Sequence, residues 1–226
     1  MMARWYRSWV WAMSLLAVAT AAVAQEGQAD LDKATDLKLQ AKSLRDLQQV
    51  IQLCESALKK GLDADSKQFA EELLAATRFQ RAERIAEAIE HSRPSRQWNA
   101  LRRMALADLD EVLKYDKDYA EAYLLKARLL TLPGGDPNEA RKAADEALKR
   151  LDDPRGKARA HLVRSRTFKD AKKAIPDVQE ALKLDPENEE AMRMWAGLLM
   201  ATERIDEAIA EMEKFLKKEP GDLGVR

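Results

Sequence analysis

A repeat with a period close to 34 residues constrains the fold more than any other feature of this sequence. Five helix-like segments end in a small or apolar residue followed by leucine. These leucines are Leu58, Leu113, Leu148, Leu182 and Leu216. They are separated by 55, 35, 34 and 34 residues, and Pro186 and Pro220 are also 34 residues apart. A fixed period of roughly 20–50 residues is the signature of repeat architectures, so we expect stacked copies of one structural unit.

Each unit is predicted to contain two helices. In the last unit, Ile205, Ala208 and Ile209 have the three- and four-residue spacing of an amphipathic helix. A second helix precedes each leucine motif, and three of these preceding helices share a small residue at one aligned position. The shared positions are Ala127, Ser165 and Ala196. A small side chain lets the facing helix approach closely, which favours a tight helix hairpin.

Composition excludes several other classes of protein. Charged residues make up 35% of the chain, while its 226 residues include only 8 glycines and 7 prolines, too few for the turns of an all-β fold. The formal net charge of zero argues against a general nucleic-acid binder. One cysteine and two histidines exclude an internal disulfide and a zinc cage. No catalytic or phosphate-binding motif is present, so we predict neither enzyme activity nor a metal or cofactor.

These helix pairs resemble the tetratricopeptide repeat family, whose unit is a pair of antiparallel helices of 34 residues. The resemblance is strongest from Glu189 to Pro220. Signature positions there hold Met192, Trp195, Ala196, Leu199, Ala208, Met212, Phe215 and Pro220, although Phe215 replaces the family's usual small residue. The resemblance implies an all-α, right-handed superhelix of antiparallel helix pairs. Three repeats are expected at about 119–154, 155–187 and 188–222, with Leu132–Pro137 as an enlarged loop.

Residues 25–118 are expected to form two degenerate helix pairs. We predict helices over Leu44–Lys60, Asp65–Glu90 and Gln97–Tyr115. Gly61 is expected to end the first helix, and Ser66 or Asp65 to cap the second. In the second clear repeat, Pro176 lies about one turn inside the expected helix, which predicts a late start or a bend.

The first 24 residues are predicted to be a signal peptide. Arg4 and Arg7 precede an apolar run of 16 residues that ends in Ala22-Val23-Ala24. Export to the periplasm or cell envelope is therefore expected, with cleavage before Gln25; an uncleaved membrane anchor is the alternative. In an exported chain, the single Cys54 is interpreted as a small buried side chain or as an intermolecular disulfide.

The resemblance also implies where a partner would bind. In this family, the first helices of successive pairs line a concave groove. The corresponding positions are Leu124, Arg128, Leu162, Arg166, Arg193 and Gly197. Two interpretations of the three arginines stand open: they bind carboxylates of an extended peptide, or they pair with nearby acids such as Glu121 and Glu190. The asparagines of the family's carboxylate clamp are absent.

We therefore predict a non-catalytic scaffold that binds a peptide or protein partner in this groove. The alternative is the N-terminal adaptor module of a larger cell-envelope enzyme. That alternative rests on the ending of the sequence, where a new connection starts after Pro220. A third expectation is a homo-oligomer that covers the uncapped last helix, with its stripe of Ile205, Ile209, Met212 and Phe215.

Overall fold

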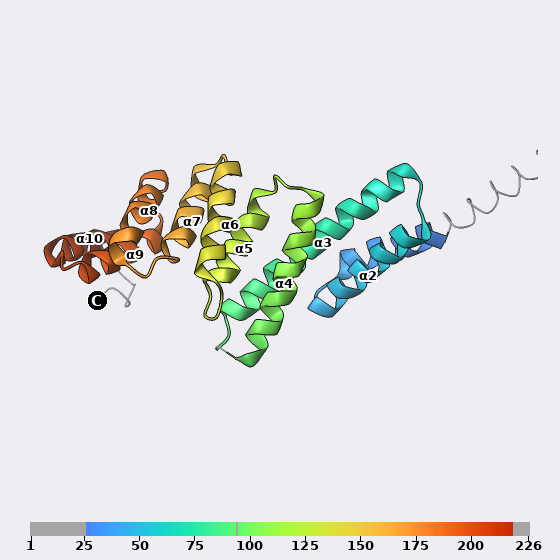
Figure 1. Ribbon diagram of the computed structural model, residues 1–226, viewed down its shortest axis with the longest axis horizontal. Coiled ribbons are helices and arrows are strands. Elements are labelled where there is room, and N and C mark those ends of the chain that lie inside the picture. Colours follow the sequence, from blue (N-terminus) through green and yellow to red (C-terminus); the bar gives the residue numbers. More distant parts are fainter. Residues whose placement is uncertain (1–25, 94, 219–226) are drawn as a thin grey trace, which may run out of the picture.

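The computed structural model describes residues 26–93 and 95–218, which form a row of packed helices (Figure 1). A helix over residues 26–40 comes first. It is followed by α2 (Leu44–Lys60), α3 (Ala64–Glu90), α4 (Arg96–Tyr115), α5 (Ala120–Thr131), α6 (Pro137–Arg150), α7 (Pro154–Ser165), α8 (Ala171–Leu184), α9 (Glu189–Ala201) and α10 (Ile205–Lys218). The described residues contain no β-strand. The predicted all-α solenoid of helix pairs is confirmed.

Consecutive helices pack as hairpins: α5 on α6, α7 on α8, and α9 on α10. Neighbouring hairpins then contact each other through α6 and α7, and through α8 and α9. In addition, α5 contacts α3 and α7, although one other helix separates it from each of them in the sequence. The helices α3, α5 and α7 therefore form one continuous wall of the molecule.

The ends of α2 and α3 show how local sequence sets helix boundaries. Ser43 and Asp46 form a reciprocal capping box at the start of α2. Gly61 ends this helix as predicted, with φ of 100° and its N–H donating to the Ala57 carbonyl. The predicted cap of α3 is wrong by two or three residues. Asp63 is the cap, because its carboxylate accepts the N–H of Ser66 at 2.9 Å and satisfies a donor that the first turn leaves unpaired.

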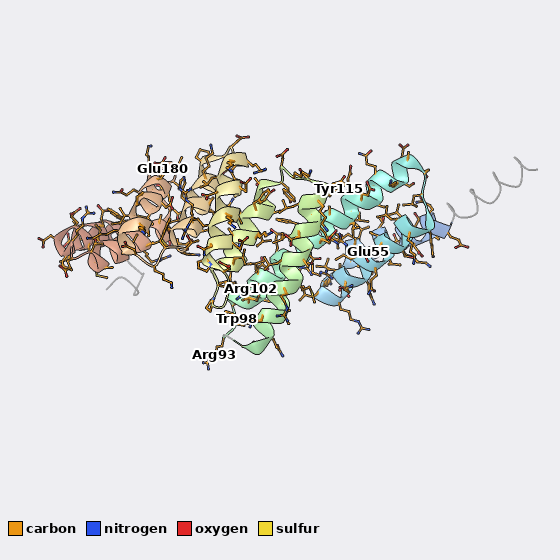
Figure 2. All side chains as sticks on the ribbon, in the orientation of Figure 1. Glu55, Arg93, Trp98, Arg102, Tyr115 and Glu180 are labelled. Atoms are coloured by element: carbon orange, nitrogen blue, oxygen red, sulfur yellow. The ribbon has the colours of Figure 1, made fainter. Side chains whose placement is uncertain are left out.

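Two side chains from the first two turns of α4 donate hydrogen bonds to neighbouring loops (Figure 2). Trp98 donates through Nε1 to the Ser92 hydroxyl at 2.9 Å, across the connection from α3. Arg102 donates through Nη2 to the Pro133 carbonyl at 2.6 Å. This second bond ties the enlarged loop between α5 and α6 to the N-terminal half of the molecule.

Pro176 lies inside α8 and does not delay its start. The helix begins at Ala171, and the Asp170 side chain accepts the N–H of Lys172 at 2.9 Å. Of the two expected effects of this proline, the late start is therefore wrong, and the bend stays a prediction. A proline removes one backbone donor in a helix interior. Here the capped first turn starts the helix well before that position is reached.

The aligned small residues lie in the interior of the repeats. Ala127, Ser165 and Ala196 are 0%, 2% and 4% exposed, and the Ser165 hydroxyl donates to the Leu162 carbonyl at 2.7 Å. Ala208 is also buried, whereas Pro186 lies exposed in the turn between α8 and α9.

Cys54 is completely buried, and burial raises the pKa of its thiol to about 11. Its neighbours include Ala34 and Val50, so the side chain behaves as a small apolar residue of the core.

Two predicted features lie outside the described residues: the signal peptide and Pro220. The side chains of Met212 and Phe215 are likewise not described. Near this end of the chain, Met200, Ile205 and Ile209 are about half exposed. Over residues 26–93 and 95–218, no helix combines the length and apolar character needed to cross a membrane.

Candidate functional site

A cavity of about 520 Å³ lies along the wall formed by α3, α5 and α7. Four of the six predicted groove residues line it: Leu124, Arg128, Leu162 and Arg166. The other two, Arg193 and Gly197, belong to α9 and are not among its lining residues. Gly197 is exposed, and a Cβ atom added there would meet no atom within 4 Å. The predicted positions from two successive repeats thus converge on one cavity, which we call the groove.

The floor of the groove is apolar. It consists of Phe79, Leu124, Leu125, Leu132, Leu162 and Val163. Leu124 is 9% exposed and Leu162 is 1% exposed, so both are held firmly by the core beneath them. Phe79 and Leu132 are partly exposed and supply the apolar surface that a ligand can reach, over a base of side chains that are already ordered.

The rim of the groove carries both signs of charge. Its carboxylates are Glu83, Glu90, Glu121 and Glu190, and its guanidinium groups are Arg128, Arg159 and Arg166. Two of the arginines already bind acids of the same chain. Arg128 donates through Nε and Nη2 to the two carboxylate oxygens of Glu90, at 2.7 and 2.9 Å. Arg166 pairs with Glu190.

Pairing is therefore the arrangement that the structure shows for the predicted arginines. Arg166 binds the anticipated acid, Glu190. Arg128 binds Glu90 instead of Glu121, because the long helix α3 contacts α5 and carries Glu90 as its last residue. Arg193, outside the groove, lies 3.5 Å from Glu189.

Partial loss of solvent around the groove shifts the ionisation of its residues. This desolvation, reinforced by the nearby Glu87, raises the pKa of Glu83 above its usual value, while Arg128 acts in the opposite direction. Desolvation likewise raises the pKa of Tyr119, and the charges of Glu121 and Glu83 add to this shift. It lowers the pKa of Arg166, partly opposed by the charge of Glu90.

Sequence reasoning missed the contribution of α3 to the groove. Phe79, Glu83 and Glu90 come from this helix, which lies in the 55-residue gap where the period is lost. Arg159 was missed as well. It lies three residues before the predicted groove residue Leu162 on α7, and that spacing alone could have placed it on the same face.

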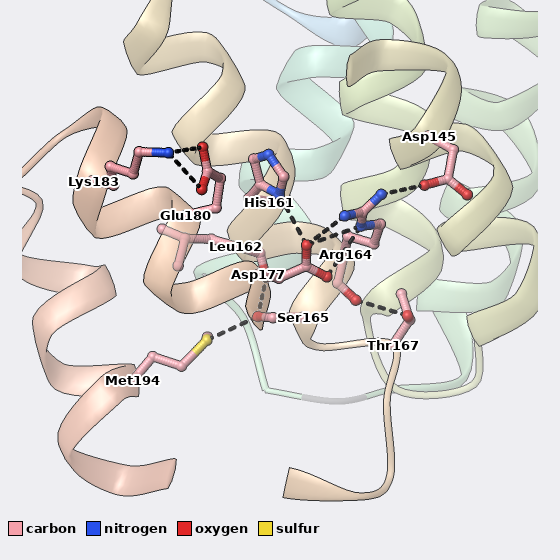
Figure 3. A network of polar contacts seen from close by, with 10 residues as sticks. All are labelled: Asp145, His161, Leu162, Arg164, Ser165, Thr167, Asp177, Glu180, Lys183 and Met194. Atoms are coloured by element: carbon pink, nitrogen blue, oxygen red, sulfur yellow. Dashed lines mark hydrogen bonds and ion pairs between the residues drawn. The ribbon is translucent and has the colours of Figure 1, made fainter. Parts of the chain in front are cut away.

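A second polar cluster joins α6, α7 and α8 (Figure 3). Asp177, 5% exposed, accepts hydrogen bonds from His161 Nδ1 at 2.8 Å and from Arg164 Nη2 at 2.6 Å. Arg164 also donates to Asp145 at 2.7 Å. Burial opposes ionisation of Asp177, but the hydrogen bonds from His161 and Arg164 hold its pKa below the usual value. The three helices are thus tied together, with His161 and Arg164 joining α7 to α8 through Asp177.

Comparison with known proteins supports the repeat assignment. A family model described as "Tetratricopeptide repeat" matches residues 167–224. No curated protein matches the sequence. Among solved structures, MamA protein shares 17% sequence identity, with a TM-score of 0.59 over 86% of this chain and 92% of that one.

Two further solved structures are similar. YrrB, whose structure is described as "a TPR protein with an unusual peptide-binding site", shares 20% identity, with a TM-score of 0.50 over 67% of this chain and 72% of its own. TTC0263, a thermophilic TPR protein of Thermus thermophilus, shares 22% identity over 88% of this chain and 95% of its own, with a TM-score of 0.48. The matched repeat model over residues 167–224 and the row of stacked helix hairpins together support the resemblance of this chain to the tetratricopeptide repeat family.

Proposed function

We propose that this protein is a non-catalytic scaffold that binds an extended peptide, or an exposed segment of a partner protein, in the groove of α3, α5 and α7. The observation that carries the proposal is the convergence of Leu124, Arg128, Leu162 and Arg166 on one cavity. The tetratricopeptide repeat fold favours a role in protein–protein interaction.

The size and lining of the groove support a peptide ligand. Its volume of about 520 Å³ lies within the range of ligand-binding clefts, roughly 300–1,000 Å³. Apolar side chains of a peptide would cover the leucine floor, and its backbone and polar groups would meet the charged rim. Burial of apolar surface supplies most of the affinity in such a site, and the charged groups supply selectivity.

The variant Arg128→Glu/Arg166→Glu tests the groove. It removes both ion pairs and places two new carboxylates beside Glu90 and Glu190, so the groove becomes strongly acidic and its charge pattern is lost. Peptides selected on the wild-type chain from a displayed random library are expected to bind the variant with an affinity that differs at least about tenfold from that of the wild type, as measured by fluorescence anisotropy.

A matched control carries the same change of charge on the second helices of two repeats. Lys142 on α6 and Lys183 on α8 are exposed and do not line the groove. The variant Lys142→Glu/Lys183→Glu should bind the selected peptides like the wild type. Equal binding by the wild type and the Arg128→Glu/Arg166→Glu variant would refute the groove as the binding site.

Export remains a proposal that depends on residues 1–24. We propose that the protein works in the periplasm or cell envelope after cleavage before Gln25. N-terminal sequencing of the mature protein tests this directly, and a mature chain that still begins at Met1 in the cytoplasmic fraction would refute it.

A further inference from the structure

The ion pairs within the groove leave more carboxylates than guanidinium groups available to a ligand. Arg128 and Arg166 are bound to Glu90 and Glu190. Within the described part of the chain, Glu83 and Glu121 form no hydrogen bond or ion pair through their side chains, and neither does Arg159. A ligand therefore meets two unpaired carboxylates, on α3 and α5, and one unpaired guanidinium group, on α7. Both carboxylates line the same groove, and the charges of both contribute to the raised pKa of Tyr119.

Two aromatic rings lie beside these carboxylates. Phe79 and Tyr119 are in contact with their ring centroids 4.9 Å apart, and both are partly buried against the core of α3, α4 and α5. Phe79 lies one helical turn before Glu83 on α3, so the two side chains share a face of that helix. Tyr119 is the N-cap residue of α5, two positions before Glu121. Phe79, Glu83 and Glu121 line the α3/α5 end of the groove, and Tyr119 contacts Phe79 beside it.

Carboxylates combined with aromatic rings are suited to a cationic side chain. Ammonium and guanidinium groups donate charge-assisted hydrogen bonds to carboxylates, and they are attracted to the faces of aromatic rings. The raised pKa of Glu83 fits this view, since a partly desolvated carboxylate beside the like charge of Glu87 gains from a nearby cation. An anionic ligand group would be repelled at this end, and the arginines that could have attracted it are already paired.

We propose that the peptide bound by this protein carries a lysine or arginine that docks at the α3/α5 end of the groove, between Glu83 and Glu121, next to an apolar residue that packs on the floor of the groove beside Leu124. This inference rests on the proposed function. It specifies the charge of one ligand side chain and the orientation of the bound peptide. The basic residue lies toward α3, and any acidic residue of the peptide lies toward Arg159 on α7.

The test compares peptides selected from a displayed random library on the full-length wild-type chain. The selected sequences are expected to contain lysine or arginine beside apolar residues. Binding of the strongest synthetic peptide should weaken about tenfold in the variant Glu83→Gln/Glu121→Gln, and by a similar factor when its basic residue is replaced by glutamine. Both effects should shrink at high salt, because the carboxylates are exposed enough to be screened.

The control variant Glu139→Gln/Glu180→Gln removes two carboxylates that lie on the exposed faces of the second helices α6 and α8. It should bind the peptide like the wild type. Since Glu83 and Glu121 are surface residues, their replacement should leave the thermal midpoint unchanged, and this measurement separates loss of binding from loss of folding.

The outcomes distinguish the inference from the function on which it rests. Suppose that the affinity of the selected peptides changes with Arg128→Glu/Arg166→Glu, but that they bind Glu83→Gln/Glu121→Gln as well as the wild type. The preference for a basic residue is then overturned, and the groove remains the binding site. Acidic selected sequences would overturn the preference in the same way. Peptides that are insensitive to both variants, or a selection that yields none, would overturn the proposed function and this inference together.

Discussion

The two halves of the molecule differ in helix length and in the proportion of alanine in their cores. The helices α2, α3 and α4 contain 17, 27 and 20 residues, whereas those from α5 to α10 contain 12–14 residues. The largest fully buried side chains at the α3–α4 contact include Ile85, Ile89 and Leu109. The core between the first two clear repeats is instead rich in alanine, with Ala127, Ala144, Ala147 and Ala160 at 0% exposure.

This difference accounts for the fact that the repeat period can be recognised in the sequence of the C-terminal half only. Close helix packing over alanine tolerates few alternatives, so the small residues recur at a fixed period. Large side chains fill a wider space in many combinations, and helix lengths can then drift without loss of packing. In Figure 1 the long helix α3 runs obliquely past the shorter repeat helices. Its length brings Glu90 to the groove.

Buried charges differ between the halves as well. Arg81 binds Asp108 through two hydrogen bonds of 2.7 and 2.6 Å, and the two side chains are only 9% and 5% exposed. In the repeats, Asp177 is buried, but its partners His161 and Arg164 are 16% and 28% exposed. We expect the two clusters to respond very differently to loss of a carboxylate.

The largest expected effect comes from Asp108→Ala in the N-terminal half. Removing one partner of a buried pair leaves the Arg81 guanidinium buried without its counter-charge, which costs about 3–5 kcal/mol of unfolding free energy. Urea denaturation followed by circular dichroism measures the loss. Glu139→Ala, which breaks the exposed Lys142–Glu139 pair, is the control and should change stability by less than about 1 kcal/mol. Equal losses in the two variants would show that burial does not distinguish these pairs.

A smaller effect is expected from Ala147→Leu in the alanine-rich core. The added side chain forces α6 and its neighbours apart, and overpacking of this kind costs about 1–3 kcal/mol. The same substitution at the exposed Ala88 of α3 should stay within about 0.5 kcal/mol of the wild type. An unchanged urea midpoint for Ala147→Leu would contradict the idea that close packing preserves the period in this half.

The smallest effect is expected from Asp177→Asn. Arg164 keeps its bond to Asp145, and the side chains of Arg164 and His161 remain partly solvated, so the loss at neutral pH should be about 1–2 kcal/mol. Because the folded pKa of Asp177 lies below its unfolded value, its contribution is complete above the unfolded value, near pH 4. It is lost as the pH falls through the folded value.

Denaturation series at neutral pH and in acid check this sign. The wild type and Asp177→Asn should differ at neutral pH and converge as the pH is lowered. A gap that stays constant into acid would show that Asp177 is not stabilised as a carboxylate by His161 and Arg164.

Local features of the fold followed from the sequence where the determining interactions are close in the chain. Gly61 ends α2 through its own positive φ, and the buried slot of Ala127, Ser165 and Ala196 was readable from aligned helices. The cap of α3 was misplaced, because Asp63, Asp65 and Ser66 all have side chains able to cap and only the geometry of the turn selects among them.

The sequence predicted some of the residues that line the groove but not how their charges pair. Leu124, Arg128, Leu162 and Arg166 were reached through the repeat, and the structure places all four around one cavity. The pairing of Arg128 with Glu90 was not reached, because these residues are 38 positions apart and belong to helices that follow no common period.

By itself, the sequence determined that the chain is helical, that its helices come in pairs, and which small residues lie between them. These properties depend on spacing within and between neighbouring repeats, which a linear pattern records. The tertiary structure alone decided that α3 joins α5 and α7, and therefore which charges of the groove are neutralised and which remain for a ligand. That outcome depends on the angle and length of an irregular helix, and no periodic pattern encodes where its side chains meet the others.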